Sequence, residues 1–222
     1  SLAEQALQIR LTKLGEAHPQ TVGSMINVGN IYTDLGEYKK AIPLLEKALQ
    51  LRRANLGEQH SDTLKSKMNL SVTYCNAEEF AKALPLLEEV LPLVQAQVGD
   101  QHPQTVITKN NLAAACHGVG QFERAADLRE EVLKVASETF GPNDFRTISS
   151  MLNLAMTEIP LKRFEQAERH LQKVWSDSER APQQHRRGMR VAIAQEFVKL
   201  YEGWDKPDDA KKWREELRKL QR

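Results

Sequence analysis

Cysteine and aromatic residues are scarce in this chain. Its 222 residues include two cysteines, Cys75 and Cys116, and aromatic side chains make up 6% of the total. Both cysteines fall inside helical patterns, so the sequence does not predict the disulfide framework that stabilises many small secreted domains. Hydrophobic residues make up 41% of the chain, which is ample for a core although aromatic residues are few.

The chain also carries almost no net charge. The 31 basic and 30 acidic side chains give a net charge of +1, which provides no electrostatic attraction for nucleic acid or for an anionic membrane. No uncharged apolar run approaches the roughly 18 residues that a membrane span requires. The first residues lack the basic start and apolar middle of a signal peptide. We therefore expect a cytoplasmic protein that binds neither nucleic acid nor membrane.

What the chain does contain is an internal repeat with a period of 42 residues. The clearest copy runs from Gly99 to Phe140, and shifting it by one period in either direction aligns many identical residues. A fixed period without insertions is typical of repeat arrays, in which each unit buries its apolar face against its neighbours. The recurring positions include Gly15/Gly57/Gly99/Gly141, Thr21/Thr63/Thr105/Thr147, Asn27/Asn69/Asn111/Asn153 and Ala41/Ala83/Ala125/Ala167.

Each copy has the apolar spacing of two amphipathic helices. We therefore predict an all-α protein, an α-solenoid of stacked antiparallel helix pairs with about eleven helices and no strand. In the second helix of each unit, the recurring alanine would let two helices approach closely. The expected helices are 1–14, 20–35, 38–55, 61–77, 80–97, 103–118, 122–139, 145–159, 164–179, 184–203 and 207–221.

The expected organisation is a single repeat domain, 1–222. Residues 1–14 align with second helices, so they represent the second helix of a truncated repeat. Four repeats follow at 15–56, 57–98, 99–140 and 141–182, and 183–222 form a divergent capping repeat with a charged outer helix. We expect the first helix to expose Leu7, Leu11 and Leu14 and to support a weak homodimer through this uncapped end.

The repeat motif is similar to that of a known family. Its residues in the first copy are Asn27, Gly29, Tyr32, Gly36, Tyr38, Ala41 and Ala48. This pattern resembles a tetratricopeptide repeat. The period of 42 residues, the linker Gly99-x-x-His102-Pro103-x-Thr105 and the run Asn110–Ala113 resemble the long-helix version found in kinesin light chains. The stretch Tyr201–Pro207 also resembles C-terminal repeats attached to some bacterial serine/threonine kinases.

Several polar residues could carry chemistry, but simpler roles fit them better. His18, His60 and His102 recur in the linkers, where stacked repeats would hold them too far apart for one zinc ion. We therefore expect them to cap helices. Cys116 adjoins His117, yet successive residues on a helix point in different directions, so we expect ordinary packed thiols. We predict no metal site, no cofactor and no enzymatic activity.

The recurring asparagines suggest a binding site. Asparagine is a poor helix former, and a sheltered amide must be hydrogen-bonded. The resemblance implies that this position lines a concave groove and contacts bound peptide. The alternative is that each asparagine bridges to a neighbouring helix and serves packing alone. The candidate groove residues are Asn27, Asn30, Lys65, Asn69, Asn110, Asn111, His117, Asn153 and Tyr201.

The groove lacks a carboxylate clamp. Family members with such a clamp pair a lysine with an asparagine four residues later, whereas here Ile26 precedes Asn30 and Met68 precedes Val72. The favoured function is a protein–protein interaction module that binds a peptide segment of a partner protein in its concave groove. The alternative is a structural spacer or self-associating scaffold region of a larger protein, either a kinesin-light-chain-like adaptor or a bacterial kinase.

Overall fold

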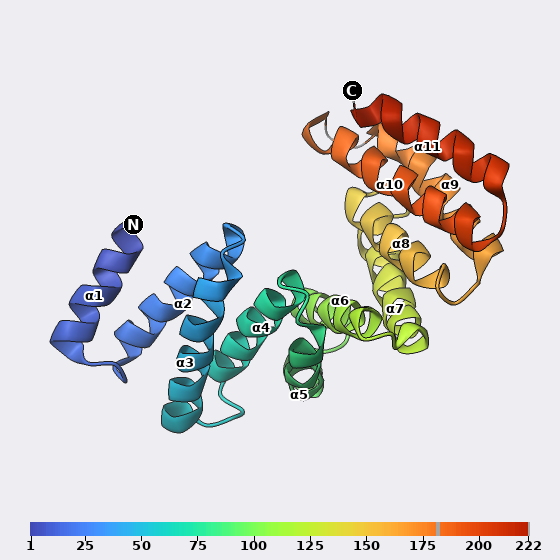
Figure 1. Cartoon of the computed structure of the whole chain (residues 1–222). Helices are drawn as coiled ribbons and strands as arrows, with labels where there is room; N and C mark the ends of the chain where they lie inside the picture. Colours follow the sequence, from blue (N-terminus) through green and yellow to red (C-terminus); the bar gives the residue numbers. More distant parts are fainter. Residues whose placement is uncertain (181–182, 222) are drawn as a thin grey trace. The chain divides into compact units, whose positions relative to one another are not determined.

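The computed structural model describes residues 1–180 and 183–221, and the regular elements within these ranges are helices joined by short linkers (Figure 1). No strand occurs in these ranges, which confirms the predicted fold class. A short 3₁₀ helix, Ser178–Arg180, accompanies the α-helices. The expected boundary between the fourth and fifth repeats, at residue 182, lies outside the described residues. The α-helices are α1 (Leu2–Leu14), α2 (Pro19–Asp34), α3 (Tyr38–Leu56), α4 (Ser61–Asn76), α5 (Phe80–Val98), α6 (Pro103–Gly118), α7 (Phe122–Phe140), α8 (Phe145–Glu158), α9 (Phe164–Asp177), α10 (Gln183–Gly203) and α11 (Pro207–Gln221).

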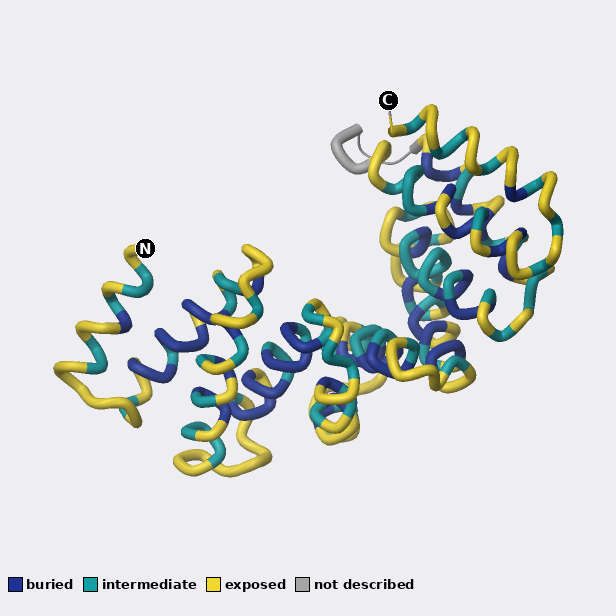
Figure 2. Tube along the Cα trace, in the orientation of Figure 1, coloured by how far each residue is buried: buried dark blue, intermediate teal, exposed yellow. Residues whose placement is uncertain are grey.

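The helices group into two compact units. The first unit comprises Ser1–Val119 and the second Gly120–Arg222, so the division falls inside the third repeat, between α6 and α7. Within each unit, consecutive helices pack against each other. Figure 2 shows that buried and exposed residues alternate along most helices, as expected for amphipathic helices. We describe each unit separately.

The linker histidines cap the first helices of their repeats, as predicted. The Nδ1 atoms of His18, His60 and His102 accept hydrogen bonds from backbone N–H groups two residues later, at 3.2, 3.1 and 3.1 Å. In the fourth repeat Asp144 takes the same place, and its Oδ1 accepts from the Arg146 N–H at 2.9 Å. These bonds satisfy N–H groups that a helix leaves unpaired at its start. Within the described part of the chain, no group of three or more potential ligands is positioned to hold a metal ion.

The caps give a test with a matched control. Replacing His60 by alanine removes the acceptor for the Asp62 N–H, and we expect the free energy of unfolding to fall by about 1 kcal/mol. His60→Asp should lose much less, because Asp144 performs this role in the fourth repeat. Urea denaturation of both variants measures the difference. Equal losses would show that the imidazole stabilises the linker in another way.

Glycines follow the long second helices of the repeats, and a further glycine, Gly118, makes room for a side chain. Gly15, Gly57, Gly99 and Gly141 follow α1, α3, α5 and α7 with φ between +82° and +88°, a conformation that favours glycine. Gly118 is the last residue of α6 and has no positive φ. A Cβ atom there would lie 2.1 Å from Cγ of Phe80. Gly118 therefore provides space for an aromatic ring.

Small residues allow close helix packing inside the repeats. Ala41, Ala83, Ala125 and Ala167, the recurring alanines of the second helices, are all 0% exposed. In the first repeat Gly29 adds a further close approach, since a Cβ there would lie 2.7 Å from Cγ of Leu45.

Replacing one of these alanines by a larger residue should therefore lower the free energy of unfolding. We expect Ala83→Leu to lower the free energy of unfolding by about 1–3 kcal/mol through overpacking, because Ala83 on α5 has no exposed surface. Ala81→Leu on the same helix is the control, since Ala81 is exposed. Thermal unfolding followed by circular dichroism compares the two variants, and equal stability of both would contradict this packing.

Polar side chains link successive helices in the first unit. The Arg10 guanidinium donates to Ser24 on α2 at 2.5 Å, and one period later Arg52 donates to Ser66 on α4 at 2.9 Å. A second pair of contacts also recurs. The hydroxyl of Tyr32 donates to Glu4 and that of Tyr74 donates to Glu46.

The second unit has an aromatic core. Phe197 on α10 stacks against Trp213 of α11 with ring centroids 3.8 Å apart. Trp175 on α9 meets the edge of Trp213 at 4.9 Å. Phe164 stacks on Trp204 at 5.6 Å. All three tryptophans of the sequence lie in this unit, so tryptophan fluorescence reports on it specifically.

The exposed side of α1 differs from the one expected. Leu7 is 5% exposed, so it belongs to the core. Leu2 and Ile9 are the exposed residues, at 86% and 56%. The prediction of an exposed Leu7 was wrong because Leu7 lies on the side of α1 that packs against α2, whereas Leu14 is exposed, at 41%, as predicted.

Candidate functional site

The first helices of the repeats lie side by side in the first unit. The Thr33 hydroxyl on α2 lies 2.9 Å from the Thr73 hydroxyl on α4. The Thr108 hydroxyl on α6 lies 3.5 Å from the Met68 sulfur on α4. The exposed sides of α2, α4 and α6 therefore form one continuous surface. We call this surface the asparagine face.

The asparagine face carries one asparagine at the same helical position on each of its three helices. Asn27 is exposed, and Asn69 and Asn111 are half-buried. Because α2 contacts α4 and α4 contacts α6, these amides form a row across the three helices. One turn earlier along the helices, Lys65 and Ile107 are exposed. The predicted residues Asn30, Asn110 and His117 are half-buried and belong to the same helices.

If the asparagines served packing alone, their side-chain amides would hydrogen-bond to a neighbouring helix, and they do not. Among the described residues, no hydrogen bond involves the side-chain amide of Asn27, Asn69 or Asn111. Only the backbone carbonyl of Asn69 is used, as acceptor for the Thr73 hydroxyl at 2.9 Å. Each amide can therefore offer a donor and an acceptor to a ligand.

Lys65 is the charged member of the asparagine face. Its Nζ atom lies 3.6 Å from Asp62, and both side chains are well exposed, at 64% and 42%. An exposed pair of this kind contributes little to stability. Lys65 can therefore exchange this partner for a carboxylate on a ligand.

The second unit places Asn153 differently. Asn153 on α8 is half-buried, and its backbone carbonyl accepts a hydrogen bond from the Arg129 guanidinium. Arg129 occupies the position where the other repeats bury Leu45, Leu87 and Leu171. Burial lowers the pKa of Arg129 to about 10, and the charge of Glu196 opposes this shift.

Tyr201 lies in the core, although the sequence placed it in the groove. It is 6% exposed, and its hydroxyl donates to Glu168 at 2.6 Å. Burial, followed by the bond to Glu168, raises the pKa of Tyr201 above its usual value. Its ring stacks on Phe197 at 6.0 Å between centroids. We therefore leave Tyr201 out of the proposed site.

A second candidate site, which the sequence did not reveal, is a groove of about 860 Å³ between α3 and α5. Its floor is formed by Leu70 and Tyr74 of α4. Successive residues of a helix are rotated by about 100°, so Leu70 and Tyr74 point roughly 100–180° around α4 from Asn69 and Lys65 and lie on a different side of the helix. We call it the α3–α5 groove. Its walls are Glu46, Leu49, Gln50, Arg53 and Ala54 on α3 and Ala81, Lys82, Pro85, Leu86 and Glu89 on α5.

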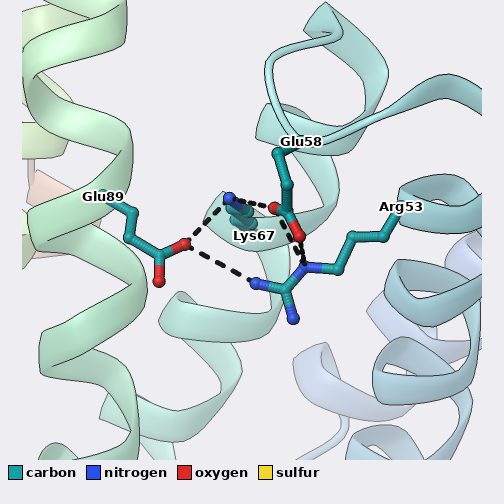
Figure 3. A network of polar contacts seen from close by, with 4 residues as sticks. All are labelled: Arg53, Glu58, Lys67 and Glu89. Carbon is teal, nitrogen blue, oxygen red and sulfur yellow. Dashed lines mark hydrogen bonds and ion pairs between the residues drawn. The ribbon is translucent and has the colours of Figure 1, made fainter.

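Two wall residues near one end of this groove, Arg53 and Glu89, belong to a network of four charged residues (Figure 3). The Nζ atom of the buried Lys67 lies 2.7 Å from Glu58 and 2.8 Å from Glu89. Arg53 reaches the same two carboxylates, at 3.0 and 3.6 Å. The hydrogen bond from Lys67, assisted by the charges of Lys67 and Arg53, lowers the pKa of Glu58.

At the other end of the groove the charges are paired as well. Glu46 accepts from the Tyr74 hydroxyl. Lys82 lies over the Tyr74 ring, 5.4 Å from its centroid, and pairs with Glu79 at 2.5 Å. Burial and the contact with Glu46 raise the pKa of Tyr74 above its usual value. Comparison of the repeats could have indicated an open space, because Ala81 stands one period after Lys39.

The cysteines are placed as expected for packed thiols. Cys116 is 0% exposed, and burial raises the pKa of the half-buried Cys75 to about 11. A thiol with a raised pKa is a poor nucleophile at neutral pH. Both side chains are thiols rather than halves of a disulfide.

Capped helix pairs at a constant period, with small residues at their crossings, define a class of protein: the α-helical repeat protein. The family model described as tetratricopeptide repeat matches residues 1–54, 21–96, 62–135 and 109–174. The chain therefore belongs to the tetratricopeptide repeat family. Its fold and family indicate a protein–protein interaction scaffold, and this fold is typically a non-catalytic interaction module.

Solved structures with the same fold include kinesin light chain-like proteins, as predicted. The kinesin light chain TPR-like repeats from Podosopora anserina share 22% identity with this chain. The match covers 92% of this chain and 96% of that one, with a TM-score of 0.72. BtubC (BKLC) from P. vanneervenii shares 18% identity over 99% of this chain and 86% of its own, with a TM-score of 0.70. The apo form of RapI shares 10% identity over 98% of this chain and 68% of its own, with a TM-score of 0.68.

At these identities the structural matches show the fold alone. A search of curated proteins finds no match to the chain. A membrane-crossing helix is not found in the part of the chain that the structure describes, since none there combines the necessary length and apolar character.

Proposed function

We propose that the asparagine face of the first unit binds an extended peptide segment of a partner protein. The observation that carries this proposal is the row of Asn27, Asn69 and Asn111, whose amides have no hydrogen-bond partner among the described residues. An amide can donate to a peptide carbonyl and accept from a peptide N–H at the same time. Such contacts recognise the backbone and give affinity without selecting one sequence.

Specificity would come from the positions beside the row. Ile107 is 55% exposed, and Val72 and Ala114 are half-buried on the neighbouring helices. These positions favour apolar ligand side chains, while Lys65 favours one acidic residue. The half-buried Asn30 on α2 and Asn110 on α6 add further side-chain amides to the same helices. His117 lies at the C-terminal end of α6. Asn153 lies at the equivalent position of α8 in the second unit.

The tetratricopeptide repeat family supports the same class of function, a protein–protein interaction scaffold. Peptide binding by this chain is our proposal, as are the cytoplasmic setting and the lack of catalysis. The chemistry of the site favours a partner that presents an extended segment with apolar side chains and one acidic residue.

A comparative pull-down tests the proposal. Wild-type protein is used as bait beside Asn69→Ala/Asn111→Ala and beside Asn55→Ala. Asn55 is a matched control because its amide is structural and donates to the Ala17 carbonyl at 3.2 Å. We expect a partner to be captured by wild type and Asn55→Ala and to be depleted with the double variant. Equal capture by all three baits would contradict binding through the asparagine face.

A further inference from the structure

Arg129 on α7 is a buried charge in the core of the second unit. It is 6% exposed, although the other repeats bury leucine at this position, as Leu45, Leu87 and Leu171. Removing a charge from water is costly unless an opposite charge lies beside it. Within the described ranges, no carboxylate forms an ion pair with Arg129, and its only hydrogen bonds go to α8.

These bonds use one nitrogen of the guanidinium. Nη1 donates to the Asn153 carbonyl and to the Thr157 hydroxyl. Nε is buried and has no hydrogen-bond partner in the described part of the chain. No hydrogen bond or ion pair of Nη2 is found there either. Because the N–H groups of Nε and Nη2 point in the same direction, one complete edge of the guanidinium makes no contact of this kind with the described residues.

Glu196 on α10 does not supply the missing partner. Its charge acts on Arg129 only through space, where it opposes the effect of burial on the pKa. The Glu196 carboxylate pairs instead with Lys199, whose Nζ lies 2.7 Å from Oε1. The second unit therefore leaves two parallel donors and the positive charge of Arg129 unused.

Two parallel N–H donors match the two oxygens of one carboxylate, and arginine forms strong, planar contacts of this kind. We propose that this edge of Arg129 binds a carboxylate group of a ligand, with Nε and Nη2 donating to its two oxygens. The bound group supplies the negative charge that the buried arginine lacks. Because it binds the folded state, it stabilises the second unit. The site uses residues of this unit alone and does not depend on the asparagine face.

The repeats themselves provide the variant that tests this site. Arg129→Leu introduces the residue that the other repeats bury here, so the second unit should fold. It should be at least as stable as the wild type without carboxylate, because leucine needs no opposite charge. Arg129→Lys keeps the charge but lacks the planar edge. Arg169→Leu on α9 is the control, since it removes an exposed arginine from the same unit.

Urea unfolding followed by tryptophan fluorescence measures the effect on the second unit, which contains all three tryptophans. Sodium formate, the smallest carboxylate, replaces sodium chloride stepwise at constant ionic strength. We expect the midpoints of the wild type and of Arg169→Leu to rise as formate replaces chloride. Arg129→Leu should have the same midpoint in both salts, and Arg129→Lys should keep only a small part of the difference.

A second probe identifies the source of the carboxylate. It is a tripeptide with one aspartate between two glycines and with both ends capped. Nuclear magnetic resonance follows the Nε–H signal of Arg129, which is assigned by its loss in Arg129→Leu. A shift with formate and with the tripeptide supports binding of an acidic side chain of a partner. A shift with formate alone supports binding of a small free acid.

Two results would overturn the proposal. In the first, the wild type unfolds at the same urea concentration in formate and in chloride, and its Arg129 signal does not move. In the second, the effect of formate persists in Arg129→Leu, which would show an adventitious ion only.

Discussion

Replacing Phe197 by alanine is expected to lower the free energy of unfolding of the second unit by about 3–5 kcal/mol, the cost of removing a large aromatic side chain from a core. Phe197 is 1% exposed and is the largest fully buried side chain among the described residues. Its ring stacks on Trp213 at 3.8 Å. The substitution removes both the buried area and this contact.

Urea unfolding followed by tryptophan fluorescence measures the loss, because all three tryptophans lie in the second unit. Phe140→Ala is the control for the same chemical change, since Phe140 is 40% exposed. We expect its effect to be much smaller. Similar midpoints for the two variants would contradict the packing described for the aromatic core.

The second large effect concerns Lys67. Its side chain is 3% exposed, and Glu58 and Glu89 are its acidic partners. Replacing both partners by glutamine would leave a buried charge without an opposite charge. We expect a loss of about 1–3 kcal/mol, the cost of leaving a buried polar group without its partners. It is smaller than the cost of breaking a fully buried ion pair, because Glu58 and Glu89 are 58% and 51% exposed.

An internal substitution tests this explanation. One period before and two periods after Lys67 the chain has methionine, Met25 and Met151, and Met25 is 4% exposed. Lys67→Met added to the double glutamine variant should therefore recover most of the lost stability. If the triple variant is as unstable as the double variant, the loss does not come from the buried charge.

Acidification should weaken the same network. Because the pKa of Glu58 is lowered in the folded state, its contribution to stability is complete above the pKa of the unfolded chain and is lost as pH falls through the lowered value. Glu58→Gln should therefore reduce the acid sensitivity of unfolding.

The helices, their caps and the repeat could be predicted because they depend on neighbours in sequence. Apolar spacing determines the helices, and His60 binds an N–H only two residues away. Ala83 and its equivalents in the other repeats are all fully buried, so a constant period identifies these close-packed positions. These features are local, or they recur at one fixed interval.

The parts that could not be predicted depend on partners distant in sequence. The α3–α5 groove depends on how far α3 and α5 stand apart over α4. The sequence offers only one sign of this space, the small Ala81 one period after Lys39. Tyr201 was misplaced because its pair is offset. Tyr32 and Tyr74 each follow their glutamate by 28 residues, whereas Tyr201 follows Glu168 by 33. A strict period therefore cannot identify Tyr201 as a core residue.

The most direct test of the account is a paired measurement on Asn69→Ala/Asn111→Ala, with Asn55→Ala beside it. Thermal unfolding without ligand gives stability, and titration calorimetry gives affinity for the peptide mapped from the captured partner. We predict that the double variant keeps its melting temperature and binds more weakly by about 1 kcal/mol for each lost amide. Asn55→Ala should show the reverse, with a lower melting temperature and unchanged affinity. A double variant that melts early and binds the peptide as tightly as wild type would contradict the account, since its asparagines would then serve packing.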